Sequence, residues 1–322
     1  MAKETWATMK RIGIVEYHQH WDYFHDLSDM LSSDDTNILA YVNDGKTSIV
    51  EFIKEIEKNS NALDVLFVNS IQDTMKDVIF WLRFKPKCKT LLTIHNVNSI
   101  LKFPNIDIKK PIRSLDTLLT YLAMKFIVLP KFDAIVVLGQ PLKDYIIKNN
   151  LYSKPIFVIP FKYHEKMYVN LFDTVVVPGR IEEHRRDYDA FLDYIKKEES
   201  VVLLGEPIGE YGKKVIEKCK QMNKQGYHIE FFEGRVPDSL YCSNLVNACT
   251  IVFPKVKESH GYGTTKEIYG QTKMVGAYFD AIKYGKKYIE GPPWVEIPIK
   301  YEDFSLENMK RYCKEEIIDR KW

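Results

Sequence analysis

The sequence predicts an α/β protein with two Rossmann-like domains, each built on a doubly wound parallel sheet, that face a cleft between them. Short β-branched and aliphatic runs recur along the chain and leave room for a helix between them, which is typical of parallel βα units. The length of 322 residues suits two domains at about 150 residues each. Hydrophobic residues make up 45% and charged residues 28%, a globular composition that excludes a disordered chain.

An N-terminal domain is expected over residues 1–165. Its strands are predicted at 12–15, 38–41, 65–68, 91–94, 134–138 and 156–159, with a helix at 48–58. The segment FKYHEKMYVNLFD, residues 161–173, breaks this rhythm with polar and aromatic side chains and therefore marks the domain boundary.

A C-terminal domain with a closing C-terminal helix is expected over residues 166–322. Its strands are predicted at 174–177, 201–204, 228–232, 250–253 and 287–289, and its helices at 187–197, 213–222 and 238–246. Open α/β sheets bind ligands beyond the carboxyl ends of their strands, so the residues that follow each strand are the candidates for a site.

Charge and cysteine usage restrict the partners and the compartment. Lys and Arg number 46 against 44 Asp and Glu, so no strong field marks nucleic acid as a partner. Five cysteines without a CxxC pair fit a reducing compartment, and the first residues show no secretory signal, so a cytoplasmic location is expected. The oligomeric state is left open.

An apolar stretch at 115–137 is interrupted by charges and by Pro130 before it is long enough to span a membrane. Its first half could form an amphipathic helix beside Arg113 and Lys125, which leaves a peripheral membrane contact open. A buried core helix is the alternative interpretation.

A basic cluster follows the strand predicted at 174–177. The strand ends at Pro178-Gly179, and Arg180, Arg185 and Arg186 come next. Guanidinium groups bind phosphate oxygens through a planar fork, and glycine lets the backbone approach them, so this cluster predicts an anion site. The alternative is a solvated helix start in which Arg186 pairs with a neighbouring aspartate.

The segment 254–285, past the strand at 250–253, is rich in polar residues and glycine. Thr264-x-x-Glu267 has the spacing of a capping box, so a helix is expected to begin there. Thr272-Lys273 could begin a second helix. Because the N-terminus of a helix favours anions, both positions are candidates for binding a diphosphate. Gly276 would permit close approach, and Gly285 is expected to follow the end of a helix.

Two further groups of polar residues follow predicted strands. Glu258, next to His260 and Gly261, could bind a sugar hydroxyl or could be a surface carboxylate. In the N-terminal half, His18, His20 and Asp22 follow the first strand; they could bind an acceptor or act as acid–base groups, or cap the next helix in solvent. No GxGxxG follows the first strand and no Walker loop is present, which counts against dinucleotide enzymes and P-loop NTPases.

These residues carry a resemblance to a known family. The C-terminal half resembles nucleotide-sugar glycosyltransferases of the GT-B fold, most of all the retaining enzymes of glycosyltransferase family 4. Gly179-Arg180, with Arg185 after it, is similar to the basic pair with which that family holds the donor diphosphate, although arginine stands here for lysine. Pro254 with Glu258 and Gly261 is similar to the start of its acidic donor-sugar motif.

The second half of that motif is matched at Asp280-Ala281-Ile282, which lies much further from Glu258 than the family's spacing allows. In the N-terminal half, His95-Asn96 resembles the family's interdomain-facing loop. The resemblance implies a metal-independent hexosyltransferase without further cofactor that moves a sugar from a nucleotide diphosphate sugar to a saccharide, lipid or protein acceptor.

The expected site residues fall into three sets, and no metal ligands are expected. The expected catalytic residues are Arg180, Arg185, Glu258, Asp22 and His18. The expected donor-binding residues are Gly179, Arg180, Arg185, Arg186, Glu258, His260, Gly261, Thr264, Thr272, Lys273, Gly276 and Asp280. The expected acceptor-binding residues are His18, His20, His95 and Asn96.

The stereochemical outcome stays open at this point. Retention is what the resemblance implies, whereas inversion would require a base such as Asp22, His18 or His20. A nucleotide-sugar epimerase of the same fold and a non-catalytic sugar-nucleotide binding protein are the alternatives.

Overall fold

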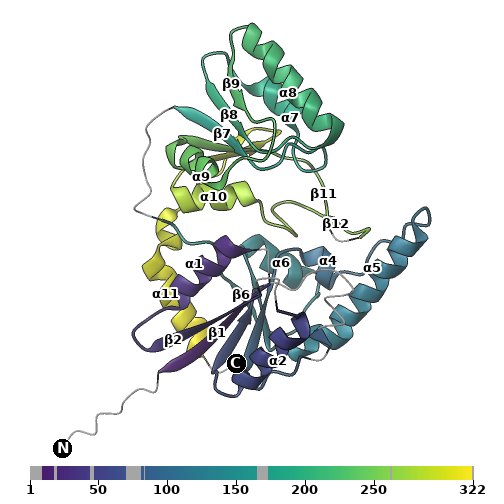
Figure 1. Cartoon of the computed structure of the whole chain (residues 1–322), viewed down its shortest axis with the longest axis vertical. Coiled ribbons are helices and arrows are strands. Elements are labelled where there is room, and N and C mark those ends of the chain that lie inside the picture. Colours follow the sequence, from purple (N-terminus) through teal and green to yellow (C-terminus); the bar gives the residue numbers. More distant parts are fainter. Residues whose placement is uncertain are drawn as a thin grey trace, which may run out of the picture.

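The computed structural model describes residues 9–17, 20–43, 47–69, 81–82, 84–164, 173–261 and 263–320. Two six-stranded sheets organise this part of the chain, one in each half (Figure 1). The first has the strand order β2-β1-β3-β4-β5-β6 and the second β14-β13-β10-β7-β8-β9. All neighbours pair in parallel except β13 and β14. The predicted fold class is therefore confirmed.

All six strands predicted for the N-terminal sheet are confirmed to within two residues at either end. The strands are β1 (Lys10–Glu16), β2 (Thr36–Val42), β3 (Val65–Val68), β4 (Lys89–Ile94), β5 (Ala134–Val137) and β6 (Ile156–Val158). The helices around them are α1 (Trp21–Leu31), α2 (Ile49–Ser60), α4 (Val97–Leu101), α5 (Pro111–Ala123) and α6 (Gln140–Lys148). A π-helical turn at Met124–Val128 and a 3₁₀ turn at Leu129–Lys131 extend α5. Every residue of β3 and β5 is buried, because helices cover both faces of the sheet.

The strands predicted for the second sheet are also confirmed. They are β7 (Thr174–Pro178), β8 (Ser200–Leu204), β9 (His228–Phe231), β10 (Thr250–Pro254) and β13 (Lys287–Gly291), with β14 (Val295–Glu296) added at the edge. The helices are α7 (Tyr188–Tyr194), α8 (Gly209–Lys224), α9 (Asp238–Asn247) and α10 (Gly276–Tyr284). As expected, α10 ends at Gly285, whose φ of 64° is left-handed.

The prediction of a helix that begins at Thr264 is wrong. Residues 266–267 form β12 (Lys266–Glu267), which pairs antiparallel with β11 (Ser259–His260). The local capping-box spacing is overridden because the Glu267 carboxylate accepts hydrogen bonds from the start of α4 in the other domain. We call residues 259–273 the cleft hairpin.

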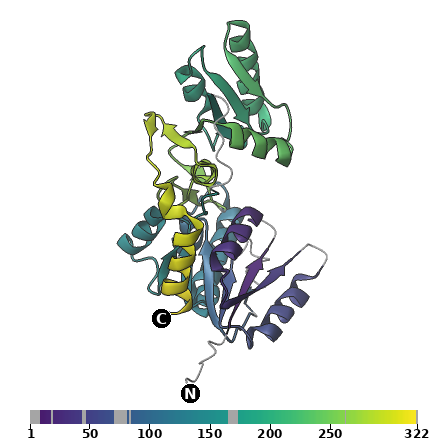
Figure 2. The ribbon, with the colours of Figure 1, turned by 90° about the vertical axis from the view of Figure 1, so that its left-hand side faces the viewer.

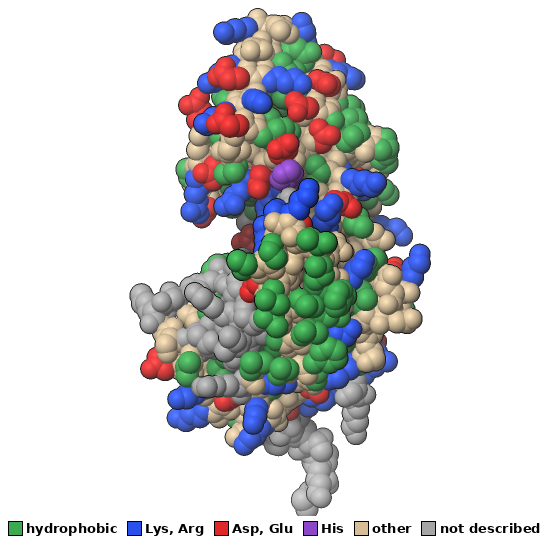
Figure 3. Space-filling view, turned by 90° about the vertical axis from the view of Figure 1, so that its right-hand side faces the viewer, with side chains coloured by type: hydrophobic (Ala, Val, Ile, Leu, Met, Phe, Trp, Pro, Cys, Tyr) green, Lys and Arg blue, Asp and Glu red, His purple; other side chains and the backbone are tan. Residues whose placement is uncertain are grey.

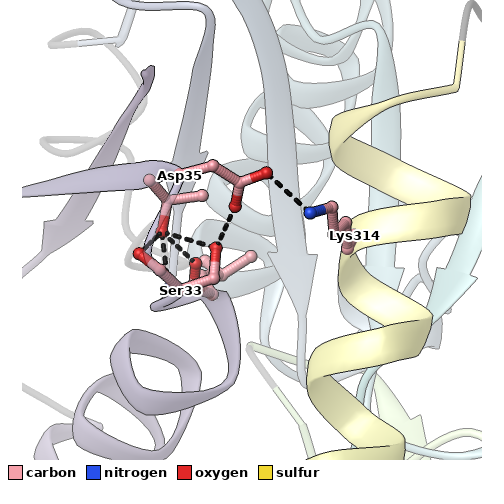
Figure 4. Close-up of polar contacts among 5 residues, drawn as sticks. Ser33, Asp35 and Lys314 are labelled. Atoms are coloured by element: carbon pink, nitrogen blue, oxygen red, sulfur yellow. Dashed lines mark hydrogen bonds and ion pairs between the residues drawn. The ribbon is translucent and has the colours of Figure 1, made fainter. Parts of the chain in front are cut away.

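The last helix crosses back to the N-terminal sheet. After β14 the chain forms a 3₁₀ turn at Tyr301–Phe304, α11 (Leu306–Cys313) and a π-helical turn at Lys314–Ile318. Figure 2 shows this helix running alongside the N-terminal sheet, where its Cys313 shares a core with Ile12. At its far end Lys314 Nζ donates to Asp35 Oδ2 at 2.6 Å, and the Ser33 hydroxyl donates to the other oxygen of Asp35 at 2.6 Å (Figure 4).

Candidate functional site in the interdomain cleft

Both sheets contain a point where the strand order reverses. In the first sheet β1 lies between β2 and β3, and in the second β7 lies between β8 and β10. The loops that leave the carboxyl ends of β1 and β3, or of β7 and β10, therefore diverge and open a crevice, which is where α/β sheets bind ligands. The candidate site is built from these two crevices.

A buried carboxylate closes the crevice of the first sheet. Glu16 is the last residue of β1, and Asn69 directly follows β3. The Asn69 Nδ2 group donates to Glu16 Oε2, and the backbone N–H of His20 donates to Glu16 Oε1 at 3.1 Å. Glu16 thus fixes the loop that carries His20 to the rim of the cleft.

Two histidines stack at this rim. The rings of His20 and His95 lie 3.8 Å apart at an interplanar angle of 12°, and the edge of Tyr23 meets His95. His95 Nε2 lies 3.2 Å from the carbonyl oxygen of Asn69, which can only accept, so Nε2 carries the proton. Burial lowers the pKa of His95 well below its ordinary value and also lowers that of His20, and the Lys273 ammonium adds to both shifts. Both imidazoles are therefore neutral near pH 7.

The crevice of the second sheet holds a buried guanidinium. Arg186 is only 9% exposed, and its guanidinium lies 5.7 Å from the centre of the Phe253 ring. Its Nη1 donates to the Arg180 carbonyl at 3.3 Å, while its Nε is buried without a hydrogen-bond partner in the described part of the chain. At Gly179, with φ of 96°, a Cβ would lie 2.4 Å from Arg186 Nη2, so glycine leaves the space that the guanidinium fills.

The other two arginines of the basic cluster lie outside this crevice. Arg180 is exposed, and Arg185 is exposed with its Nε 3.4 Å from the Glu182 carboxylate. The alternative in which Arg186 pairs with Asp187 or Asp189 is not realised: Asp187 caps α7 by accepting from the N–H of Ala190 at 3.0 Å, and Asp189 lies 3.6 Å from Lys218 Nζ.

A cavity of about 590 Å³ lies between the two domains next to the stacked histidines, within the size range of small-molecule sites. It contains the predicted residues His20, Asp22, Gly276 and Asp280. The residues that line it are His20, Trp21, Asp22, Tyr23, Phe161, Asp238, Tyr241, Cys242, Gly276, Phe279, Asp280 and Lys283.

The charged groups of the cavity come from both domains. Lys283 Nζ on α10 lies 3.8 Å from the Asp22 carboxylate on α1. Burial raises the pKa of Asp280 to about 7, with Asp22 raising it further while Lys283 and Arg186 oppose the shift. Tyr241 Oη donates weakly to Asp280 at 3.5 Å. Near neutral pH Asp280 can therefore both donate and accept hydrogen bonds.

The cleft hairpin holds most of the remaining predicted donor residues. Glu258, just before it, is exposed and pairs with Lys266 at 2.7 Å. The Thr264 hydroxyl donates to the Asn105 carbonyl at 2.5 Å, and the buried Thr272 hydroxyl accepts from the N–H of Ile268. A Cβ at Gly261 would lie 2.4 Å from Ser99 Oγ, so this glycine permits close contact between the domains.

Several predicted residues occupy other positions or fall outside what the structure describes. The backbone of Lys273 pairs with that of Asn96, which brings the hairpin to the histidines. His18 lies outside the described residues, as does the side chain of His260. Among the described residues, no cluster of His, Cys, Asp and Glu could hold a metal ion.

Sequence reasoning missed three residues that shape the site. Glu267 is fully buried, and its Oε1 accepts from the backbone N–H and the hydroxyl of Ser99, each at 2.8 Å. Burial raises its pKa, which these hydrogen bonds partly offset. Asn69 and Lys283 were missed as well, although Asn69 follows a predicted strand and the strand-end rule could have found it.

Comparison with known proteins establishes the fold. No family model and no curated protein matches the sequence. The structure is similar to that of a sucrose-phosphate synthase from Thermosynechococcus elongatus, with a TM-score of 0.55 and 12% identity over 97% of this chain and 91% of that one. It is also similar to a glycosyltransferase involved in avilamycin A biosynthesis, with a TM-score of 0.50 and 11% identity over 95% of this chain and 88% of that one. The chain has the GT-B fold.

Proposed function

We propose that this chain is a glycosyltransferase that binds a nucleoside diphosphate sugar in the cleft and transfers the sugar to an acceptor held by the N-terminal domain. The observation that carries the proposal is Arg186, a buried guanidinium at the switch point of the second sheet with no carboxylate partner among the described residues. A buried charge is costly unless an opposite charge compensates it. A diphosphate at this point would supply that charge.

The proposed binding mode uses the crevice between β7 and β10. The diphosphate would lie against Arg186 and the backbone near Gly179, within reach of the exposed Arg180. Departure of the sugar leaves additional negative charge on the diphosphate, and a fixed guanidinium stabilises that charge as it develops. In this binding mode Arg186, with Arg180 in reach, replaces the basic pair Arg180 with Arg185 that the sequence predicts, because Arg185 is exposed beside Glu182.

The proposed acceptor side uses the neutral histidines. His20 lines the cavity, and its unprotonated ring can hydrogen-bond an acceptor hydroxyl or take up its proton. Asp280, with its pKa raised to about 7, can bind a sugar hydroxyl as donor or acceptor. His95 holds the ring of His20 in place by stacking and acts as a positioning residue.

The test is a product analysis with sugar nucleotides of uridine, guanosine and adenosine, each with and without a panel of saccharide and lipid-linked acceptors. We expect release of one nucleoside diphosphate that increases with an acceptor, together with a glycosylated product. Conversion of the sugar to an isomer without an acceptor would contradict the proposal and identify an epimerase instead.

A matched pair of variants links the activity to the site. Arg186→Gln should reduce turnover about 100-fold, because an ionic hydrogen bond to the diphosphate is lost. Arg185→Gln changes the neighbouring exposed arginine, whose carboxylate partner is Glu182. It should retain turnover within a few-fold; equal losses in both variants would argue against the assigned role of Arg186.

A further inference from the structure

Helix α5 turns an apolar face toward solvent. Ile112, Leu115 and Leu119 lie three or four residues apart and therefore share one side of the helix. Ile108, in the turn before the helix, and Phe126, seven residues after Leu119, are exposed as well. Ile108 is 89% exposed, Ile112 85% and Phe126 65%. Figure 3 shows a continuous apolar area on this side of the N-terminal domain, with basic side chains beside it.

The buried side of α5 carries three hydroxyl residues beside Tyr121, its other buried residue. Ser114, Thr117 and Thr120 are each at most 3% exposed. The Ser114 hydroxyl donates to the Asp107 carbonyl at 3.0 Å and the Thr117 hydroxyl to the Arg113 carbonyl at 2.7 Å. A helix that serves only this chain's core would have the reverse polarity. The apolar residues of α5 therefore fit a partner outside the chain.

The charge around the apolar face restricts that partner. Residues 102–127 contain five basic side chains and two acidic ones, a net charge of +3 against +2 for the whole chain. Lys109, Lys110 and Arg113 are exposed and have no carboxylate partner among the described residues. An apolar helix face with a basic rim matches the surface of a bilayer that contains anionic lipids.

We propose that residues 102–127 form a membrane-docking face that binds anionic bilayer surfaces. None of the described helices is long and apolar enough to cross a membrane, so the contact is interfacial. A symmetric contact between two copies would bring the basic rims of both against each other, which disfavours a second copy of this chain as the partner. The docking does not depend on the proposed transferase activity.

The face lies directly behind the cleft hairpin. At Gly263, with φ of 60°, a Cβ would lie 1.9 Å from the Thr117 hydroxyl oxygen, so the hairpin packs tightly onto the buried side of α5. The same hairpin brings Lys273 to the stacked histidines. Docking through α5 would therefore hold the acceptor side of the cleft close to the lipid surface.

The test is co-sedimentation of the full chain with vesicles of phosphatidylcholine, alone or with 30% phosphatidylglycerol. We expect the bound-to-free ratio to be at least tenfold higher on the anionic vesicles and to fall in 0.5 M salt, since exposed charges are then screened.

The double variant Ile112→Ser/Phe126→Ser should lose at least tenfold in this ratio. Lys109→Glu/Arg113→Glu should lose the preference for anionic lipid. Val295→Ser, at an exposed apolar residue of the second sheet, is the control and should bind like the wild type.

Results that differ from these count against membrane docking through residues 102–127. Absence of vesicle binding by a wild-type chain that shows cooperative unfolding would overturn it, as would equal binding by the wild type and both face variants. A wild-type dimer in size-exclusion chromatography that Ile112→Ser/Phe126→Ser converts to a monomer, without vesicle binding by either, would assign the face to a second copy.

Discussion

Single residues in the cleft are set to unusual protonation states by their surroundings. The pKa values of Asp280 and of the stacked pair His20 and His95 are all shifted, and burial is the largest cause of each shift. The carboxyl group is thereby kept partly protonated and the imidazoles neutral, which suits groups that exchange hydrogen bonds with hydroxyls.

The raised pKa of Asp280 predicts a pH-dependent stability. A carboxyl whose pKa rises from 3.8 to about 7 on folding stabilises the folded state when protonated, and that contribution is lost as the pH rises through about 7. Asp280→Asn removes the titration. Between pH 5.5 and 7.5 the wild type should lose about 1–2 kcal/mol of unfolding free energy relative to Asp280→Asn, after allowance for water in the cleft. Urea unfolding of both at the two pH values measures this; a difference that does not change with pH would refute it.

The lowered pKa of His95 predicts that its ring is not protonated between pH 8 and 6. Because the folded state resists protonation of this ring, its NMR signals should not move between pH 8 and 6. Its contribution to stability is present above the ordinary histidine pKa and decreases as the pH falls below it. Assignment through His95→Gln identifies the signals, and a titration midpoint near 6.5 would contradict the stacking of His95 on His20.

At the scale of elements, the cleft hairpin connects the second sheet to α4 and α5 of the first domain. Its main anchor is the Glu267 carboxylate, which accepts from the backbone N–H groups of Asn98 and Ser99 at 3.2 and 2.8 Å. These N–H groups belong to the first turn of α4 and therefore have no acceptor within the helix. A carboxylate from the other domain thus satisfies the helix start, and the hairpin position follows from that contact.

The hydrogen bonds of Glu267 predict the order in which substitutions at this position lower the free energy of unfolding. Glu267→Ala leaves buried N–H groups of Asn98 and Ser99 without acceptors and should cost about 2–4 kcal/mol of unfolding free energy. Glu267→Gln keeps one acceptor oxygen and should cost less than half as much. Equilibrium unfolding in urea gives both values. Equal losses, or a loss below about 0.5 kcal/mol for Glu267→Ala, would mean that the hairpin is held by other contacts.

The strands could be predicted from the sequence, but the hairpin could not. Parallel strands buried on both faces leave continuous apolar runs, so β3 and β10 stand out directly. Glu267 in a Thr-x-x-Glu spacing carries a local helix signal, whereas its actual partners lie about 170 residues away in the chain, which no local pattern encodes. In the basic cluster the sequence predicts an anion site after β7, but which arginine turns inward depends on the space above Gly179.

Two segments of the second half of the chain hold the domains of the whole molecule together. The cleft hairpin joins them near the site, and α11 returns to cover the N-terminal sheet, where Met309, Cys313 and Ile317 are buried beside Ile12. A helix expected from the sequence to close the C-terminal domain thus completes a core of the first domain. Stability of the N-terminal domain should therefore depend on the last residues of the chain.

Ile317 tests that dependence. Its side chain is fully buried in the core shared with the N-terminal sheet, so Ile317→Ala removes one methylene and two methyl groups and leaves a cavity. We expect a loss of about 2–4 kcal/mol. Val295→Ala, at a half-exposed residue of β14, is the control and should change stability by less than about 0.5 kcal/mol. A loss at Ile317 no larger than the control would contradict the packing of α11 on the N-terminal sheet.

Calorimetric titration of the chain with UDP, GDP and ADP tests directly whether a diphosphate compensates the buried charge of Arg186. We predict that the wild type binds one of these nucleotides, that Arg185→Gln binds it within a few-fold, and that Arg186→Gln binds it about 100-fold more weakly while keeping its fold. Equal affinity of Arg186→Gln and the wild type, or no binding of any nucleoside diphosphate by the wild type, would rule out Arg186 as a diphosphate ligand.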